Sequence, residues 1–207
     1  MLEKYMEEQN LVTTVLKKSL KNDKIVQAYL FSSDDIDYIY KYAKDFSKDI
    51  ISLSGLPSET LENIYKRIDK DEYTELKVVE PDGNTIKKSQ LIELQNSVST
   101  KPVEAYKIIY IIKNCEKLNS SSANCILKFL EEPEDDIIAI LLTDNINMVL
   151  PTIKSRCQIL NFKNNNSNKM KNILFFVGLD ITDEDKEKFI NNSIDFSYTH
   201  LKITTKL

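Results

Sequence analysis

Apolar residues recur along this chain with two different periods, which predict helices alternating with buried strands. Near the N-terminus, Leu11, Val15, Leu16 and Leu20 follow helical spacing, so an amphipathic helix is expected within the first twenty residues. Residues 26–31 form a short apolar run typical of a strand, and residues 34–50 return to helical spacing. The apolar side of that second helix comprises Ile36, Ile39, Tyr40, Ala43 and Phe46.

The middle of the chain carries the clearest pattern. Residues 108–112 and 137–142 are uninterrupted apolar runs rich in isoleucine, as in strands that are buried on both faces of a parallel sheet. Between them, residues 120–132 show a helical stripe ending before Pro133. Strand, helix and strand in this order form a βαβ unit with a right-handed crossover. The stripe comprises Ala123, Ile126, Leu127 and Leu130.

Weaker patterns complete the expected order of elements. Helices are predicted at residues 59–68, from an N-cap at Ser89 to Val98, and between Asn145 and Leu150. Strands are predicted at residues 75–79 and 157–162. The chain is therefore expected to be an α/β protein with a mainly parallel sheet covered by helices.

Length and composition fit one α/β domain with an appendage. The chain has 207 residues, and from residue 163 onward its composition shifts to Asn, Lys and Ser, which marks a linker. We therefore expect a domain at residues 1–162, followed at residues 163–207 by a linker and the start of a small helical unit. No apolar run approaches the roughly 20 residues that a membrane span needs, so a cytoplasmic protein without a membrane partner is expected.

Charge and cysteine content exclude some classes of site. The net charge of −4 offers no overall electrostatic footprint for a phosphate backbone. The cysteines Cys115, Cys125 and Cys157 form no close pair, so neither a zinc site nor a disulfide framework is predicted, and all three are expected to be small buried residues. Only two of the 28 basic residues are arginines, Arg67 and Arg156, which directs attention to both.

Two linked motifs resemble a known family. The helix segment that ends Leu127-Lys128-Phe129-Leu130-Glu131-Glu132-Pro133, followed after a strand by Ser155-Arg156-Cys157, is similar to the bacterial clamp-loader family of AAA+ proteins, in particular its δ′ members. The resemblance runs from about Val26 to Phe162. It implies a three-layer AAA+ (RecA-like) domain, with the following residues as the start of a small helical lid.

The phosphate loop of that family is degenerate here. A working loop, G-x-x-x-x-G-K-[ST], holds phosphates with backbone N–H groups and a lysine. After the first strand this chain instead reads Ser32-Ser33-Asp34-Asp35, without glycine or lysine. The aspartates suit a helix N-terminus and would repel a triphosphate. They either block nucleotide actively or are ordinary helix-start residues, and both interpretations predict no bound cofactor.

The acids that hold Mg²⁺ in an ATPase are also missing. They should follow the strand at residues 108–112, where this chain has Lys113-Asn114-Cys115. Glu116 lies beyond the expected position and is expected to be a solvated residue. Thr143, Asp144 and Asn145, at the end of the next strand, are expected to cap a short helix rather than to sense a γ-phosphate. Neither a metal site nor hydrolysis by this chain is predicted.

Arg156 is the residue to which the resemblance assigns a role. In the family, the arginine of the Ser-Arg-Cys motif is an arginine finger, which stabilises charge on a phosphoryl group bound by the adjacent subunit. The alternative is an ion pair with a carboxylate of its own domain. Cys157 is expected to be a buried residue that opens a strand rather than a nucleophile, because no activating histidine is near it in sequence.

The resemblance implies a subunit that works within a complex. Its expected partners are the ATPase (γ/τ) and δ subunits, with the sliding clamp and primed DNA reached through the complex, as part of a DNA polymerase III holoenzyme. Many members of the family carry a four-cysteine zinc module, but residues 47–73 contain no cysteine. A C-terminal collar domain is also expected to be absent from this sequence, which is then either part of a longer protein or an unusually short member. The alternatives are an active AAA+ ATPase with an atypical loop, and a nucleic-acid-binding module that acts alone.

Overall fold

The computed structural model describes residues 1–98, 102, 104, 107–131 and 136–163. Within them the elements follow in this order: η1 (Leu2–Tyr5), α1 (Asn10–Lys21), β1 (Ala28–Ser32), α2 (Ile36–Ser52), α3 (Ser58–Asp69), β2 (Leu76–Val79), α4 (Lys88–Val98), β3 (Ile108–Ile112), η2 (Cys115–Lys117), α5 (Ser120–Glu131), β4 (Ile137–Thr143), α6 (Pro151–Lys154) and β5 (Gln158–Asn161).

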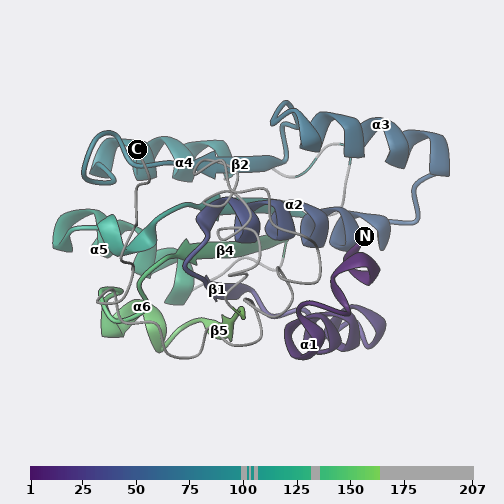
Figure 1. Cartoon of the computed structure of the whole chain (residues 1–207). Helices are drawn as coiled ribbons and strands as arrows, with labels where there is room; N and C mark the ends of the chain where they lie inside the picture. Colours follow the sequence, from purple (N-terminus) through teal and green to yellow (C-terminus); the bar gives the residue numbers. More distant parts are fainter. Residues whose placement is uncertain (99–101, 103, 105–106, 132–135, 164–207) are drawn as a thin grey trace, which may run out of the picture. The chain divides into compact units, whose positions relative to one another are not determined.

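All five strands form one parallel sheet in the order β2-β3-β4-β1-β5. The central pairs keep a continuous register, with Ile108 opposite Ile137 and Ala28 opposite Ala139. Because the strands are parallel, all their carboxyl ends lie at one edge of the sheet and all their amino ends at the other. The α/β class with a mainly parallel sheet is confirmed, and α2 lies across the front of the sheet in Figure 1.

The sheet is buried on both faces, as the unbroken apolar runs predicted. Alternate residues of each strand enter two separate cores, so that Ile109 and Ile111 pack with α1, α2 and α3, whereas Ile108, Tyr110 and Ile112 pack with α4, α5 and α6. Every residue of β3 and β4 is buried. This arrangement gives the three layers that were expected, with helices on both faces of the sheet.

The first predicted helix has a different buried face from the one expected. The helix begins at Asn10, after a separate turn of 3-10 helix, and it buries Val12, Thr13 and Leu16. Leu11 is 74% exposed and Val15 is 40% exposed, so the predicted apolar stripe was wrong at these two positions. Thr13 is buried instead because its hydroxyl is hydrogen-bonded to that of Tyr42 at 2.8 Å, which satisfies both groups.

Three smaller expectations were also wrong. The helix predicted between Asn145 and Leu150 is a turn, and the short helix α6 follows it at Pro151. Ser89 lies inside the first turn of α4 rather than at its N-cap, because α4 begins at Lys88. Of the three cysteines only Cys115 is buried, whereas Cys125 and Cys157 are partly exposed.

The predicted division at residue 162 stays a prediction. The chain divides into two units, Met1–Asn164 and Asn165–Leu207. Of the expected linker and lid region, only Lys163 is among the described residues, and Pro133 also lies outside them. In the described part of the chain, no helix is long and apolar enough to cross a membrane.

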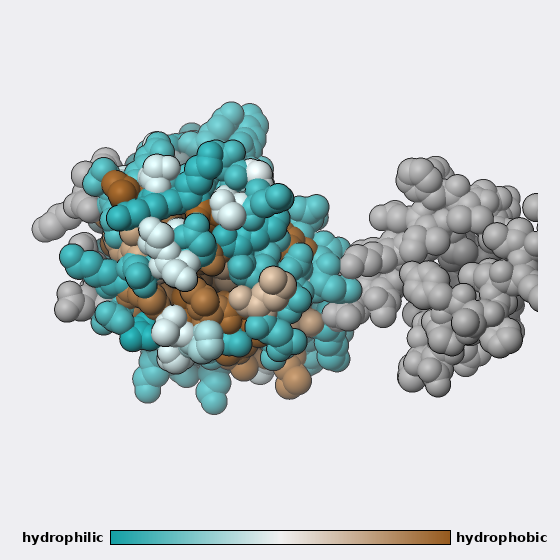
Figure 2. Space-filling model, turned by 90° about the vertical axis from the view of Figure 1, so that its left-hand side faces the viewer, coloured by the Kyte–Doolittle hydropathy of each residue, from teal (hydrophilic) through white to brown (hydrophobic). Residues whose placement is uncertain are grey.

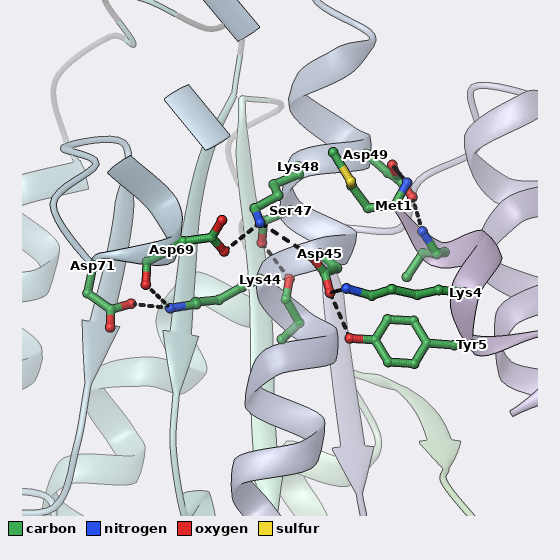
Figure 3. Close-up of polar contacts among 12 residues, drawn as sticks. Met1, Lys4, Tyr5, Lys44, Asp45, Ser47, Lys48, Asp49, Asp69 and Asp71 are labelled. Atoms are coloured by element: carbon green, nitrogen blue, oxygen red, sulfur yellow. Dashed lines mark hydrogen bonds and ion pairs between the residues drawn. The ribbon is translucent and has the colours of Figure 1, made fainter. Parts of the chain in front are cut away.

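A polar network ties the N-terminal segment to α2 and α3 (Figure 3). The side chain of Asp45 on α2 is buried, and its carboxylate accepts hydrogen bonds from the Tyr5 hydroxyl at 2.7 Å and the Lys4 ammonium at 2.7 Å. Lys48, also buried, lies 3.4 Å from Asp45 and 2.6 Å from Asp69 at the end of α3. The buried pair Asp45 and Lys48 on α2 thus joins the N-terminal turn to α3.

The network also determines the ionisation of Asp45. Burial acts to raise the pKa of Asp45, but the hydrogen bonds from Lys4 and Tyr5, with the charges of Lys4 and Lys48, outweigh it and hold the pKa below its ordinary value. The folded state therefore favours the ionised carboxylate more strongly than the unfolded chain does.

Replacing Asp45 by Asn should lower the free energy of unfolding by about 2–3 kcal/mol, because the change leaves buried Lys48 with a single carboxylate partner. Urea denaturation of the wild type and of Asp45→Asn measures the difference. Asp37→Asn, in the exposed first turn of the same helix, is the control and should cost no more than about 1 kcal/mol, from the lost interaction with the helix dipole. Equal losses in the two variants would contradict a special contribution from Asp45.

The contribution of Asp45 should also depend on pH. Because its folded-state pKa lies below the unfolded value of about 3.9, its stabilisation is full above that pH and is lost as the pH falls through the folded-state pKa. The difference in unfolding free energy between wild type and Asp45→Asn should therefore shrink below about pH 4. A difference that stays constant from neutral pH down to about pH 2.5 would show that the charge of Asp45 is not what stabilises the fold.

Candidate functional site

The degenerate phosphate loop lies at the carboxyl edge of the sheet, between β1 and α2. Its backbone and side chains are bonded to each other. The Ser33 N–H donates to the Thr143 carbonyl at 3.1 Å, the Asp35 N–H donates to the Ser33 hydroxyl at 3.2 Å, and the Asp35 carboxylate caps α2 by accepting from the Tyr38 N–H at 3.0 Å. In a working loop such N–H groups point toward the phosphates, but here they hold the β1–α2 connection closed.

The position expected for the metal-binding acid is occupied by a paired cation. Lys113 follows β3 directly, and its ammonium lies 2.6 Å from a carboxylate oxygen of Glu80 and 4.4 Å from the ring centroid of Tyr40. The Tyr40 hydroxyl in turn donates to Asp71 at 2.6 Å. Among the described residues, no group of His, Cys, Asp and Glu side chains could hold a metal ion.

Thr143 organises the end of β4. It is fully buried, and its hydroxyl donates to Glu116 at 2.7 Å and accepts from the Asn145 N–H at 3.1 Å. The Asn145 side chain accepts from the Asn147 N–H at 3.1 Å. These contacts cap a turn, not the short helix that was expected. Glu116 is half-buried rather than solvated, because this bond draws it toward β4.

Arg156 lies at the opposite edge of the sheet, between α6 and the amino end of β5. Its guanidinium donates to the Thr152 carbonyl at 2.8 Å, to the Ser155 hydroxyl at 3.3 Å and to the carboxylate of Glu131 at 2.6 Å. Both partners of the ion pair remain accessible, with side chains 32% exposed for Arg156 and 51% for Glu131. The intramolecular ion pair weighed as an alternative is therefore present, and its exposure leaves the arginine reachable from outside.

The Ser155-Arg156-Cys157 motif borders a hollow of about 290 Å³. Its other walls come from the segment that leads into β1, from the C-terminal end of α5 and from the start of β5, including Val26, Phe129 and Gln158. Burial raises the pKa of the Cys157 thiol to about 12, so at neutral pH the thiol is protonated and a poor nucleophile. This environment supports the prediction that Cys157 is not a nucleophile, although the residue is partly exposed and lies just before β5 instead of opening it.

Two groups of predicted residues thus lie apart. The loop Ser32–Asp35 and Lys113 meet at the carboxyl edge, while Arg156 meets Glu131 at the amino edge. β1 has five residues, so its ends lie about 13 Å apart. Arg156 therefore lies at the opposite ends of the strands from its own degenerate loop.

Sequence reasoning missed Glu131 as a partner of Arg156. The two residues are 25 positions apart, and no periodicity connects them. The one available signal was that each belongs to one of the two linked motifs, which are brought together by α5 and α6.

The helices α4, α5 and α6 lie on the side of the described part that Figure 2 shows. Apolar residues occupy the middle of this face and hydrophilic residues surround them (Figure 2). On this side of the sheet Ile92 of α4 is 41% exposed and Met148, before α6, is 65% exposed. An apolar centre with a polar rim is typical of protein–protein contacts rather than of basic nucleic-acid grooves.

Comparison with known proteins agrees with these features. Residues 8–166 match the model of the family described as DNA polymerase III, delta subunit. The chain is 37% identical to DNA polymerase III subunit delta′ of Bacillus subtilis over 154 residues, which are 73% of this chain and 46% of that protein. It is 30% identical to subunit tau/gamma of Haemophilus influenzae over 152 residues, 72% of this chain and 22% of that protein.

The fold is shared with a solved structure of related type. The DNA clamp loader delta protein of Bacillus subtilis superimposes with a TM-score of 0.51 at 15% sequence identity, covering 86% of this chain and 51% of that protein. This likeness shows the fold that the two proteins share, a parallel α/β sheet covered by helices. The chain covers 46% of the length of the delta′ relative, which is less than half. Because residues 8–166 match the family model and the chain is 37% identical to a delta′ subunit, the chain belongs to the DNA polymerase III delta subunit family.

Proposed function

We propose that this chain is the AAA+ part of a clamp-loader δ′ subunit, which binds no nucleotide itself and presents Arg156 to ATP held by a neighbouring ATPase subunit. The observation that carries the proposal is the separation of the two edges of the sheet. At the carboxyl edge the N–H groups of Ser33 and Asp35 are bonded to Thr143 and Ser33, and at the amino edge lies an accessible arginine.

The proposal that the chain binds no nucleotide rests on the phosphate-binding and metal-binding groups that the site lacks. Phosphates need N–H donors and positive charge, whereas the loop Ser32–Asp35 is acidic and the N–H groups of Ser33 and Asp35 donate to acceptors within the protein. Mg²⁺ needs carboxylate ligands, and Lys113 stands at that position, paired with Glu80. Both requirements of phosphoryl transfer are unmet in the described residues, so we infer that the chain does not hydrolyse ATP.

The second half of the proposal rests on Arg156. A guanidinium stabilises charge on a transferred phosphoryl group through paired N–H donors, which lysine does not offer. Arg156 belongs to the Ser155-Arg156-Cys157 motif, and it borders a hollow whose walls are partly polar and partly apolar. A finger supplied in trans makes hydrolysis by the neighbour depend on assembly. The similarity to both delta′ and tau/gamma proteins supports a complex of related subunits as the setting.

In this role the subunit contributes to opening a sliding clamp and placing it on primed DNA, as part of a soluble cytoplasmic DNA polymerase III holoenzyme with γ/τ and δ subunits. A second candidate function is an active AAA+ ATPase with an atypical phosphate loop, because the chain is also similar to a tau/gamma protein. Nucleotide affinity of the chain itself distinguishes the two.

The isolated chain should show no binding of Mg²⁺-ATP with a Kd tighter than about 1 mM, because neither the loop nor the metal position is available. Isothermal titration calorimetry measures the affinity, and the melting temperature with and without Mg²⁺-ATP provides a second readout. A tau/gamma-type subunit measured in parallel is the positive control. A micromolar Kd for the chain would favour the ATPase alternative.

Replacing Arg156 by Ala should abolish most hydrolysis at the ATP site it serves, since an arginine finger is worth about 10³–10⁵ in rate. Arg156→Lys should recover little, because a point charge lacks the paired donors. The measurement is steady-state ATP turnover by the reconstituted loader, with assembly verified by size-exclusion chromatography.

Arg67→Ala is the matched control for this experiment. Arg67 is the other arginine of the chain and makes an exposed ion pair with Glu104 at 2.8 Å. Its loss should leave turnover unchanged. If the Arg156 variants assemble and hydrolyse ATP like the wild type, Arg156 is a structural residue and the trans role is wrong.

A further inference from the structure

The Arg156 guanidinium donates to three acceptors, which belong to different parts of the fold. Thr152 and Ser155 lie within four positions of the arginine, on or beside α6, and move with it. Glu131 is 25 positions away and is the last residue of α5. Of these acceptors, Glu131 is therefore the one that fixes the guanidinium relative to a separate element of the fold.

α5 is a firm support for Glu131. At its start, the Ser122 N–H donates to the Asn119 side chain at 2.9 Å while the Asn119 N–H donates to the Ser122 hydroxyl at 3.0 Å, a reciprocal cap. Along its length α5 buries Ala123, Ile126 and Leu130 in the core that α4, α5 and α6 form with one face of the sheet. Leu130, next to Glu131, is 8% exposed, so the backbone that carries the carboxylate is anchored.

The contacts leave part of the guanidinium available. An arginine side chain has five N–H donors, and the three hydrogen bonds to Thr152, Ser155 and Glu131 involve Nη1 twice and Nη2 once. Among the described residues, the remaining donors have no hydrogen-bond acceptor, so a phosphate oxygen can be bound while the three contacts persist. An arginine held in this way has lost most of its rotamer freedom before the partner arrives.

We propose that Glu131 is a positioning residue for Arg156: its carboxylate, fixed at the end of α5, holds the guanidinium in the orientation in which it meets the phosphates of the neighbouring subunit's ATP. This inference rests on the proposed function of Arg156. Glu131 itself does not touch the nucleotide, because a carboxylate beside a triphosphate would repel it. It acts on the rate through the arginine.

The experiment is a double-mutant cycle in the reconstituted loader, with turnover measured as a function of ATP concentration for Glu131→Ala, Arg156→Ala and the double variant. Glu131→Ala should lower kcat at the served site roughly tenfold, as expected when a reacting group is misplaced rather than removed. KM for ATP should change little, because the neighbour binds the nucleotide. In the Arg156→Ala background the same change should have no further effect.

Glu131→Gln tests the geometry separately from the charge. It keeps an acceptor oxygen at the same place, so it should recover most of the turnover that Glu131→Ala loses. Glu62→Ala, which removes an exposed helical glutamate of α3, is the matched control and should behave like the wild type. Melting temperatures of the variants and size-exclusion chromatography of the complexes show that folding and assembly are retained.

The outcomes separate the two proposals. If Arg156→Ala lowers turnover but Glu131→Ala leaves it unchanged or raises it, the positioning role is wrong while the finger stands. If Glu131→Ala lowers turnover by the same factor in the wild type and in the Arg156→Ala background, the positioning role is also wrong, because the effect then does not depend on Arg156. Full turnover in Arg156→Ala would refute the proposed function itself.

Discussion

The burial of the parallel sheet on both faces is the constraint on which the rest of the structure depends. Strands β3 and β4 are buried at every residue, and their alternate side chains enter two different cores. Neither face can be left to water, so helices must cover both, and parallel strands require crossover connections that supply those helices. The position of every connecting loop, at one edge of the sheet or the other, follows from this requirement.

The two edges then serve different purposes. In parallel α/β sheets, ligands bind outside the carboxyl ends of the strands, and that edge is here closed by Ser33, Asp35 and Thr143 through mutual hydrogen bonds, with Lys113 paired to Glu80 beside them. The polar residues that would hold a ligand instead hold the loops. The amino edge, which usually contributes to stability, carries the accessible Arg156. In the proposed function, the chemistry lies at the amino ends of the strands instead of the carboxyl ends.

A scaffold that presents a residue to a partner must keep that residue in place by itself. The apolar cores hold α5 and α6 against the sheet, and the Glu131–Arg156 contact joins their exposed ends. On the other face, the buried network around Asp45 joins the N-terminal turn to α2 and α3. In both places charged groups connect elements that the hydrophobic cores have already brought close. The ion pairs therefore determine orientation more than they determine whether the chain folds.

The sequence by itself determined the α/β class, the strands at residues 108–112 and 137–142, and the loss of the phosphate loop, because apolar runs and missing glycines are local properties of the chain. It misassigned Leu11 and Val15, since helical periodicity does not say which of two adjacent stripes meets the core when a buried hydroxyl pair between Thr13 and Tyr42 is available. Only the tertiary structure placed Arg156 beside Glu131, and both on the edge opposite Ser32–Asp35. That arrangement depends on how α5 and α6 pack, and contacts between residues far apart in the chain arise from packing rather than from local sequence preference.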